Sequence, residues 1–192
     1  MNALIDDLPT SVEVAGKEYP INTGFRVCLL CILAWEDYEL TAGEKTQVML
    51  ELMYPEIPED QQAAAEMAVL FLDGGKEEGA ASTDAGGRLF SFDKDAKYIY
   101  AAVKQQYGVD LSAESGLHWW KFLWMFADLP EECFFHRMIS LRRGYQTGKL
   151  TKEEREAYAA LRDVMELPEH LTAEELEADD EFMRLLLEGE KQ

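Results

Sequence analysis

The sequence contains no apolar run long enough to span a membrane and no basic segment at its start. Its apolar stretches fall short of the ~18 residues that a bilayer-crossing helix needs. Residues 1–7 carry two acidic side chains and none of the basic ones that begin a signal peptide. We therefore expect the protein to stay in the cytoplasm in which it is made. With three cysteines and no export signal, we expect reduced thiols and no disulfide bonds.

Basic side chains are also scarce. The chain has 18 lysines and arginines against 38 aspartates and glutamates, which gives a formal net charge of -20. A surface of this charge repels nucleic-acid phosphates and anionic lipid head groups, so we expect neither nucleic acid nor a membrane as a partner. An acidic protein that mimics DNA is a distant alternative, and an ordinary solvated acidic surface is the simpler interpretation.

The rest of the composition is that of a folded protein. Hydrophobic residues make up 47% and charged residues 29% of the 192 residues, whereas disordered chains combine so much charge with far fewer large apolar side chains. We expect a single helical domain over residues 1–167, with a flexible glycine-rich loop at residues 73–88. Residues 168–192 are expected to form an acidic C-terminal tail that can include a short helix.

The apolar pattern predicts a mainly α fold. Alternation from Val12 to Ile21 predicts a short hairpin, and the apolar run from Phe25 to Trp35 fits a buried helix better than a strand. Asp60 and Asp93 are predicted helix caps, and Pro130 suits the first turn of another helix. Further predicted helices cover residues 41–53, 61–72, 93–107, 117–127, 130–144 and 151–165. The sequence thus predicts a compact helical domain of about six to eight helices with a short N-terminal β-hairpin.

None of the candidate catalytic or metal-binding motifs meets its full requirements. Cys28 and Cys31 have the spacing of a redox or metal pair, but they lie inside an apolar run without a second ligand pair, so core packing is preferred. Gly74-Gly75-Lys76 lacks the Ser or Thr that holds magnesium in a phosphate loop. The three histidines are isolated from one another and from any nucleophile motif. We therefore predict no enzyme activity, no catalytic residue, no cofactor and no metal ion.

Residues 117–127 carry large apolar side chains in nearly every direction around the predicted helix. Such a segment is either central in the fold or covered by a partner. We expect Trp120 and Trp124 to anchor the core, and Trp119 and Phe122 to lie on another face. Because one small core need not cover every aromatic side chain here, we predict a protein-binding surface. Its predicted residues are Trp119, Phe122, Phe126, Phe134 and Phe135.

One region is locally basic despite the acidic chain. It contains Arg137, Arg142, Arg143, Lys149 and Lys152. These side chains can meet acidic residues of this chain or of a partner. We prefer such an intramolecular or solvated role to a nucleic-acid site.

Several passages resemble a bacteriophage family called gene product fifteen. The likeness is carried by FDKDAKYIYAAV at residues 92–103, QYGVDL at 106–111 and LHWWKF at 117–122, and by INTGFR at 21–26 after the predicted hairpin. It covers residues 1–165, and the passage from the Tyr-Gly-Val-Asp-Leu run to the His-Trp-Trp-Lys-Phe run is its most specific part.

Members of this family occur in long-tailed phages and prophages. The resemblance implies a non-catalytic tail-assembly role in the bacterial host cell, as a chaperone-like partner of the tape-measure protein. An amphipathic groove could cover the apolar stripe of such a helical partner. The alternatives are another tail protein as partner, a structural component of the finished tail, a thiol redox enzyme using Cys28 and Cys31, and an acidic DNA-mimic inhibitor. Homo-oligomer formation also stays open.

Overall fold

The computed structural model describes residues 2–75 and 87–167. In these ranges a two-stranded hairpin precedes eight helices, which confirms the predicted mainly α fold. The strands are β1 (Ser11–Val14) and β2 (Lys17–Pro20), and the helices are α1 (Phe25–Glu36), α2 (Ala42–Met53), α3 (Gln61–Leu72), α4 (Ala96–Tyr107), α5 (Trp119–Ala127), α6 (Phe134–Gln146), α7 (Lys152–Ala160) and α8 (Arg162–Met165). Most of the glycine-rich loop and the whole acidic tail, with the properties predicted for them, lie outside the described residues.

The hairpin is antiparallel and closes through a two-residue turn. Its register pairs Val14 with Lys17 on either side of the turn. The turn residues, Ala15 and Gly16, both have positive φ angles, of 49° and 79°. A turn of this kind matches the right-handed twist of two short strands. The buried side chain of Val14 then joins the hairpin to the core that it shares with α3.

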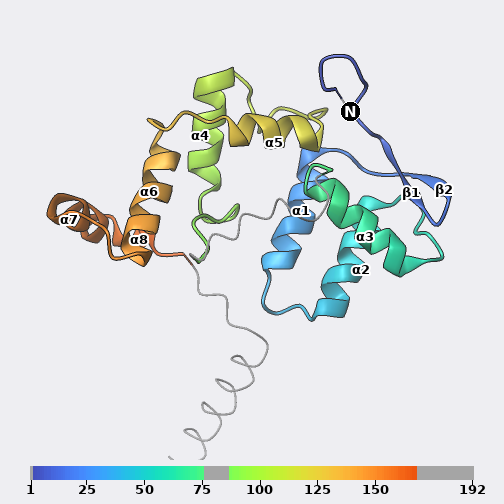
Figure 1. Cartoon of the computed structure of the whole chain (residues 1–192), viewed down its shortest axis with the longest axis horizontal. Helices are drawn as coiled ribbons and strands as arrows, with labels where there is room; N and C mark the ends of the chain where they lie inside the picture. Colours follow the sequence, from blue (N-terminus) through green and yellow to red (C-terminus); the bar gives the residue numbers. More distant parts are fainter. Residues whose placement is uncertain (1, 76–86, 168–192) are drawn as a thin grey trace, which may run out of the picture.

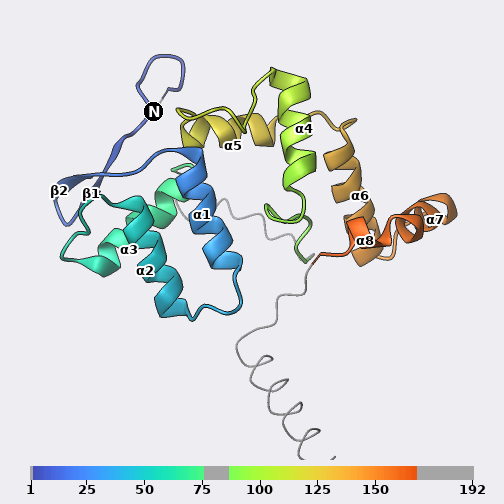
Figure 2. The same ribbon diagram turned by 180° about the vertical axis from the view of Figure 1, so that it is seen from behind.

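The hairpin and helices α1 to α3 form an N-terminal half (Figures 1 and 2). α3 has the predicted bounds, because the Asp60 carboxylate accepts a hydrogen bond from the Ala63 N–H at 3.0 Å. α2 begins with a capping box, in which Thr41 and Glu44 each accept the backbone N–H of the other. Local caps thus determine where both helices begin.

Helices α4, α6, α7 and α8 form a C-terminal half (Figures 1 and 2). α4 ends at the predicted Gly108, but its predicted cap is wrong: the helix begins at Ala96 with Asp95 in the N-cap position, and Asp93 lies in the preceding turn. The reason is a tertiary contact, since the buried carboxylate of Asp95 is bound by Arg142. The Asp95 carboxylate makes no capping hydrogen bond to α4 and instead accepts from the Ser91 N–H at 3.0 Å and from Arg142.

Both predicted ends of α6 are also wrong. The residues after Pro130 form a turn, and the helix begins at Phe134, where the Sγ atom of Cys133 accepts the N–H three residues later at 3.4 Å. The helix continues past Gly144 instead of ending there. A Cβ atom at this position would clash with the Leu150 side chain, so this glycine permits a close approach inside a helix.

α5 joins the two halves by contacts with α1 and α4. Beside its first turn, the Phe25 N–H donates to the Leu117 carbonyl at 2.9 Å, and the Trp119 N–H donates to the Thr23 carbonyl at 2.7 Å. The passages INTGFR and LHWWKF, about a hundred residues apart in the sequence, therefore meet as a short antiparallel bridge.

Two indole side chains of α5 donate hydrogen bonds to carbonyl groups at the end of α3. Trp119 Nε1 donates to the Leu72 carbonyl at 2.8 Å, and Trp120 Nε1 donates to the Phe71 carbonyl at 2.8 Å. Both acceptors belong to the last turn of α3, where carbonyl groups lack partners within the helix, although the Phe71 carbonyl also accepts the Gly74 N–H at 3.0 Å. The end of one helix in the N-terminal half is thus satisfied by side chains of the junction.

His118 is the N-cap residue of α5 and a candidate for pH dependence. Its Nδ1 atom accepts the Trp120 N–H at 3.1 Å, and its Nε2 atom lies 3.0 Å from the Pro9 carbonyl. These contacts fit the neutral ring with its proton on Nε2. Burial lowers the pKa of His118, the positive charge of Lys121 lowers it further, and the Pro9 carbonyl opposes both effects.

We expect the protein to lose stability as the pH falls below about 6.5, the pKa of an unfolded histidine. A folded pKa below the unfolded one means that the unfolded state binds the proton more readily, and protonation of Nδ1 also removes the cap. Urea unfolding at pH 7.5 and 5.5 tests this, with His118→Asn as a cap residue that does not titrate. Equal pH dependence of wild type and variant would contradict it.

Candidate protein-binding groove

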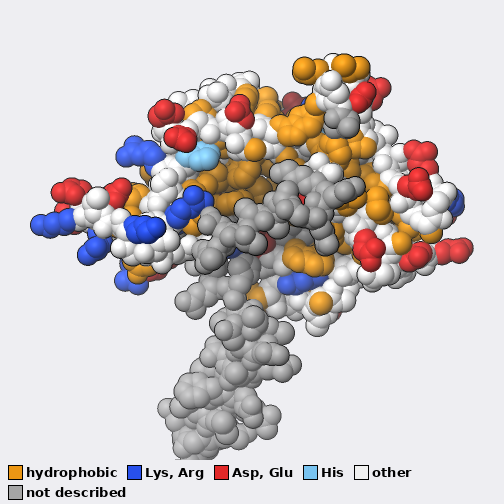
Figure 3. All heavy atoms as spheres, in the orientation of Figure 1, with side chains coloured by type: hydrophobic (Ala, Val, Ile, Leu, Met, Phe, Trp, Pro, Cys, Tyr) orange, Lys and Arg blue, Asp and Glu red, His pale blue; other side chains and the backbone are white. Residues whose placement is uncertain are grey.

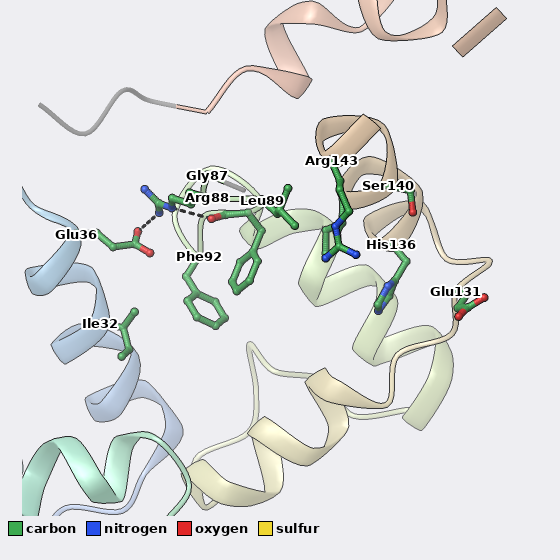
Figure 4. Close-up of a pocket in the computed structure, with 12 residues that line it drawn as sticks. Ile32, Glu36, Gly87, Arg88, Leu89, Phe92, Glu131, His136, Ser140 and Arg143 are labelled. Atoms are coloured by element: carbon green, nitrogen blue, oxygen red, sulfur yellow. Dashed lines mark hydrogen bonds and ion pairs between the residues drawn. The ribbon is translucent and has the colours of Figure 1, made fainter. Parts of the chain in front are cut away.

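A groove of about 940 Å³ lies between α1 and α6. Figure 4 shows Ile32 and Glu36 on the α1 side, His136 and Arg143 on the α6 side, and Phe92 between them. Its other lining residues are Gly87, Arg88, Leu89, Phe90, Glu131, Ile139 and Ser140. A cavity of this size can hold several side chains of a partner segment.

The floor of the groove is aromatic and rests on an aromatic layer behind it. The rings of Phe90 and Phe92 lie 5.2 Å apart edge to face. Behind them, Phe126 lies 5.3 Å from each of these rings, and Phe135 lies 5.9 Å from Phe90. Such ring pairs hold one another in place. The floor is therefore a firm apolar surface.

Charged side chains form the rim. On the α1 side, Arg88 makes an ion pair with Glu36, and its Nε atom donates to the Phe90 carbonyl at 2.7 Å. The two side chains of this ion pair are 24% and 23% exposed. On the α6 side, Arg143 and His136 extend from the helix beside the groove (Figure 4). A partner would thus meet an apolar floor between charged walls.

A buried arginine fixes the α6 wall to the floor. Arg142 and Asp95 are 2% and 0% exposed, and they form a two-point ion pair with N–O distances of 2.6 and 2.9 Å. The same guanidinium donates to the carbonyls of Leu89, Val164 and Met165 at 3.0, 2.8 and 2.7 Å. All five of its N–H groups are therefore used. They tie α6 to α4, α8 and the floor segment.

A second, smaller cavity of about 320 Å³ shares Phe92 with the groove. It lies among α1, α4 and α5, and its other lining residues are Phe25, Arg26, Leu29, Ala96, Ile99, Tyr100, Leu111, Ser112 and Phe122. At its edge, the Arg26 guanidinium donates to the carbonyls of Leu111 and Ser112 at 3.0 and 2.6 Å. The mostly apolar lining suits a single large apolar side chain.

The structure corrects the predicted placement of the aromatic residues. Trp119 and Phe135 are buried, each at 1% exposure, and line neither cavity, whereas Phe122, at 2% exposure, lines only the smaller one. Trp120 is buried as predicted, but Trp124 is 43% exposed. The predicted faces of α5 are wrong because the Trp119 side chain points into the core, where its indole N–H donates to the Leu72 carbonyl at the end of α3.

Four of the five predicted binding residues form an internal aromatic column. The ring of Phe122 stacks on Trp119 at 5.5 Å and on Phe126 at 6.0 Å, and Phe126 packs on Phe135 at 5.4 Å. Phe126 and Phe135 lie directly behind the groove floor. Only Phe134 is well exposed, at 44%, and its ring packs 5.1 Å from Tyr98. The column lies behind the groove and does not line it.

The groove residues themselves were largely missed in the sequence. Phe90 and Phe92 alternate along the chain, but they follow the glycine-rich loop and lie in no predicted helix or strand. Ile32 lay within an apolar run that gave no indication of which face is partly exposed. In the sequence, Arg143 is distinguished only as a member of the basic cluster. The groove forms from segments that are distant in sequence, and local patterns do not report such an arrangement.

The two halves differ in surface charge. Figure 3 shows lysines and arginines gathered over the α6 to α8 region, whereas most acidic side chains in view lie elsewhere. Residues 134–167 contain seven basic and five acidic side chains, while residues 2–75 contain three basic and fourteen acidic ones. Of the predicted basic cluster, Arg137, Arg143, Lys149 and Lys152 lie at the surface of the C-terminal half, whereas Arg142 is buried.

The cysteine pair lies in the core of the N-terminal half. Cys28 and Cys31 are 0% and 2% exposed, as free thiols. Burial raises the pKa of Cys28 far above its ordinary value, and burial raises the pKa of Cys31 to about 11. Both thiols are therefore protonated at neutral pH, which disfavours nucleophilic or redox chemistry. Among residues 2–75 and 87–167, no cluster of His, Cys, Asp or Glu could hold a metal ion.

None of the helices in the described part of the chain is long and apolar enough to cross a membrane.

A family model described as bacteriophage Gp15 protein matches residues 4–167, which covers both halves, the junction and every residue that lines the groove. No curated protein and no solved structure shows significant similarity to the chain.

Proposed function

The chain belongs to the bacteriophage Gp15 protein family, and from this membership we propose that it is a tail-assembly protein that binds the tape-measure protein during tail morphogenesis. It acts in the cytoplasm of the bacterial host as a chaperone-like partner, without catalysis. The groove between α1 and α6 receives a helical segment of the tape measure, and the smaller cavity receives one of its apolar side chains.

The observation that carries this proposal is the pairing of an apolar floor with charged walls. An amphipathic helix buries its apolar stripe in such a groove and leaves its polar flanks at the rim. The two cavities share Phe92, so neighbouring turns of one helix can reach both. A helix with its side chains is about 10–12 Å wide, which suits an open groove better than a closed pocket.

The burial of the cysteine pair supports the non-catalytic part of the proposal. A redox enzyme needs an accessible thiol with a lowered pKa, whereas burial raises the pKa values of Cys28 and Cys31. The pair instead fills space in the core, where cysteine behaves as a small apolar residue.

We expect tape-measure fragments to bind the wild-type chain and to bind an Ile32→Gln, Ile139→Gln variant at least about tenfold more weakly, which is about 1.4 kcal/mol. Both side chains are partly buried and line the groove from opposite sides. Co-expression with overlapping fragments, followed by affinity measurement on purified complexes, tests this.

Val69→Gln is the matched control, because Val69 is an exposed aliphatic side chain on α3 that does not line the groove. Circular dichroism would establish that all variants are folded. The proposal fails if no fragment is bound by the wild type, or if the folded double variant binds as well as the control. Recovery of the protein in purified virions would instead indicate a structural component of the tail.

A further inference from the structure

Two charged side chains of α1 tie this wall of the groove to segments of the chain beyond residue 86. In the first turn of α1, the Arg26 guanidinium donates to the carbonyls of Leu111 and Ser112. At the last residue of α1, the Glu36 carboxylate forms an ion pair with Arg88. The helix is therefore held by a polar contact at each end.

Between these two ends, the packing of α1 against the C-terminal half is incomplete. The groove separates α1 from α6 (Figure 4), and the smaller cavity lies among α1, α4 and α5. Side chains beside an empty space lose packing contacts on that side. Within its own half, α1 packs along α2. The position of α1 relative to α6 therefore depends strongly on the contacts at its ends.

The Glu36 end is connected to α6 through the floor segment, residues 87–92. The Ser91 Oγ atom lies 3.5 Å from the Glu36 carboxylate, beside the ion pair with Arg88. The backbone carbonyl of Arg88 in turn accepts a hydrogen bond from Gln146 Nε2 on α6 at 2.9 Å. A continuous series of polar contacts thus runs from one wall of the groove to the other.

Glu36 is a locally unfavourable residue at the end of a helix. Its negative charge lies at the C-terminus of α1, where the helix dipole favours cations, and the last turn of α1 contains no basic residue. The ion pair with Arg88 opposes this cost. The carboxylate therefore serves the contact with the floor segment and not the stability of α1 itself.

We propose that Glu36 is a positioning residue that sets the width of the groove, by holding the C-terminal end of α1 against the floor segment. When its contact with Arg88 is broken, this end of α1 moves away from α6, while the Arg26 end stays in place. The effect on groove width is independent of the proposed function. The effect on binding rests on it: a helical segment contacts both walls of the narrow groove and only one wall of the wide groove.

The distance between two spin labels measures the groove width in the full chain. The labels are attached at Glu39→Cys, beyond the end of α1, and at Lys149→Cys, beyond the end of α6, where both side chains are exposed. Cys133→Ser removes the partly exposed thiol, and burial protects Cys28 and Cys31 from the reagent. We expect one narrow distance distribution for the otherwise wild-type chain.

Glu36→Lys breaks the contact without weakening the helix. A lysine at the C-terminus of α1 suits the helix dipole, but it faces the like charge of Arg88. We expect the ratio of long to short label distances to rise about tenfold, because an ion pair is lost and a repulsion of similar size is gained. Adding Arg88→Glu restores opposite charges and should return most molecules to the short distance.

Glu131→Lys is the matched control for the distance measurement. Glu131 is an exposed carboxylate that lines the groove beside α6, and it makes no ion pair within the part of the chain that the structure describes. The same change of charge at the groove then leaves the Glu36 contact intact, so the label distances should be those of the wild type. Equal distance distributions for Glu36→Lys and this control would overturn the proposal.

Affinity for tape-measure fragments is the second readout. Glu36→Lys should bind a fragment several-fold more weakly than the wild type, because fewer molecules have the narrow groove. Equal affinities alongside longer label distances would overturn the role of groove width in binding. If the wild type binds no fragment, the proposed function fails, and the label distances still decide whether Glu36 sets the width.

Discussion

Replacing Arg142 by methionine should lower the free energy of unfolding by about 3–5 kcal/mol, a large fraction of the stability of an ordinary domain. The substitution leaves the Asp95 carboxylate, which is 0% exposed, without its cation. It also removes the donors to the carbonyls of Leu89, Val164 and Met165. Unsatisfied buried groups of this kind each destabilise the folded state. Urea unfolding followed by circular dichroism measures the loss.

Arg142→Lys separates charge from geometry. Lysine keeps the positive charge, but it has three donors on one nitrogen in place of a planar five-donor fork. We expect it to recover less than half of the loss, because one ammonium cannot reach both oxygens of Asp95 and three carbonyls on two segments. Arg137→Met is the surface control, since Arg137 is exposed. A stability of Arg142→Met within about 1 kcal/mol of this control would refute the expectation.

Trp119→Ala should cost about 3–5 kcal/mol, the usual loss for truncating a buried tryptophan. The Trp119 side chain is 1% exposed and stacks on Phe122 at 5.5 Å. It also binds the Leu72 carbonyl, so the truncation opens a cavity and removes a hydrogen bond at the junction. Thermal and urea unfolding of the variant measure the effect.

Two further tryptophan variants test the reason for this loss. Trp124→Ala changes a side chain that is 43% exposed, so we expect about 1 kcal/mol or less. Trp119→Phe keeps an aromatic ring but lacks the indole N–H, and an unpaired Leu72 carbonyl should cost about 1–3 kcal/mol. Equal losses for Trp119→Ala and Trp124→Ala would show that α5 presents a different face to the core.

The helices of this protein were predictable where local signals decide them. The bounds of α3 follow from Asp60 and an apolar spacing that repeats with each turn, and both signals lie within the helix. The capping box at Thr151 opens α7 for the same reason. The predicted cap of α4 is wrong because Asp95 takes the N-cap position without a side-chain cap hydrogen bond, and its carboxylate is bound instead by Arg142, 47 residues away.

Local sequence patterns do not predict which face of α5 points toward the core. When apolar side chains surround a helix, spacing alone does not indicate which of them point inward. The answer comes from two acceptors, the carbonyls of Phe71 and Leu72, which take the indole N–H groups of Trp120 and Trp119. The carbonyl acceptors at the end of α3 therefore determine which face of the apolar helix α5 points toward the core.

None of the five predicted binding residues lines the groove, and of the five only Phe122 lines the smaller cavity. A surplus of aromatic side chains in residues 117–139 indicated an apolar surface, and Phe126 and Phe135 do lie behind the groove floor. The floor itself is made by Phe90 and Phe92, whose neighbours in space come from α1 and α6. Pairing of such distant segments leaves no periodic trace in the sequence.

The dependence of α3 on the indoles of α5 sets an order of events during synthesis. The Leu72 carbonyl receives its hydrogen bond from Trp119, which is synthesised 47 residues later. At about 5–20 residues per second, the ribosome needs roughly 2–10 seconds to make that interval. During this time the nascent N-terminal half lacks the aromatic cover that Trp119 and Trp120 provide. Joining of the halves is therefore a late step, and a pause in translation between α3 and α5 would prolong the aggregation-prone stage.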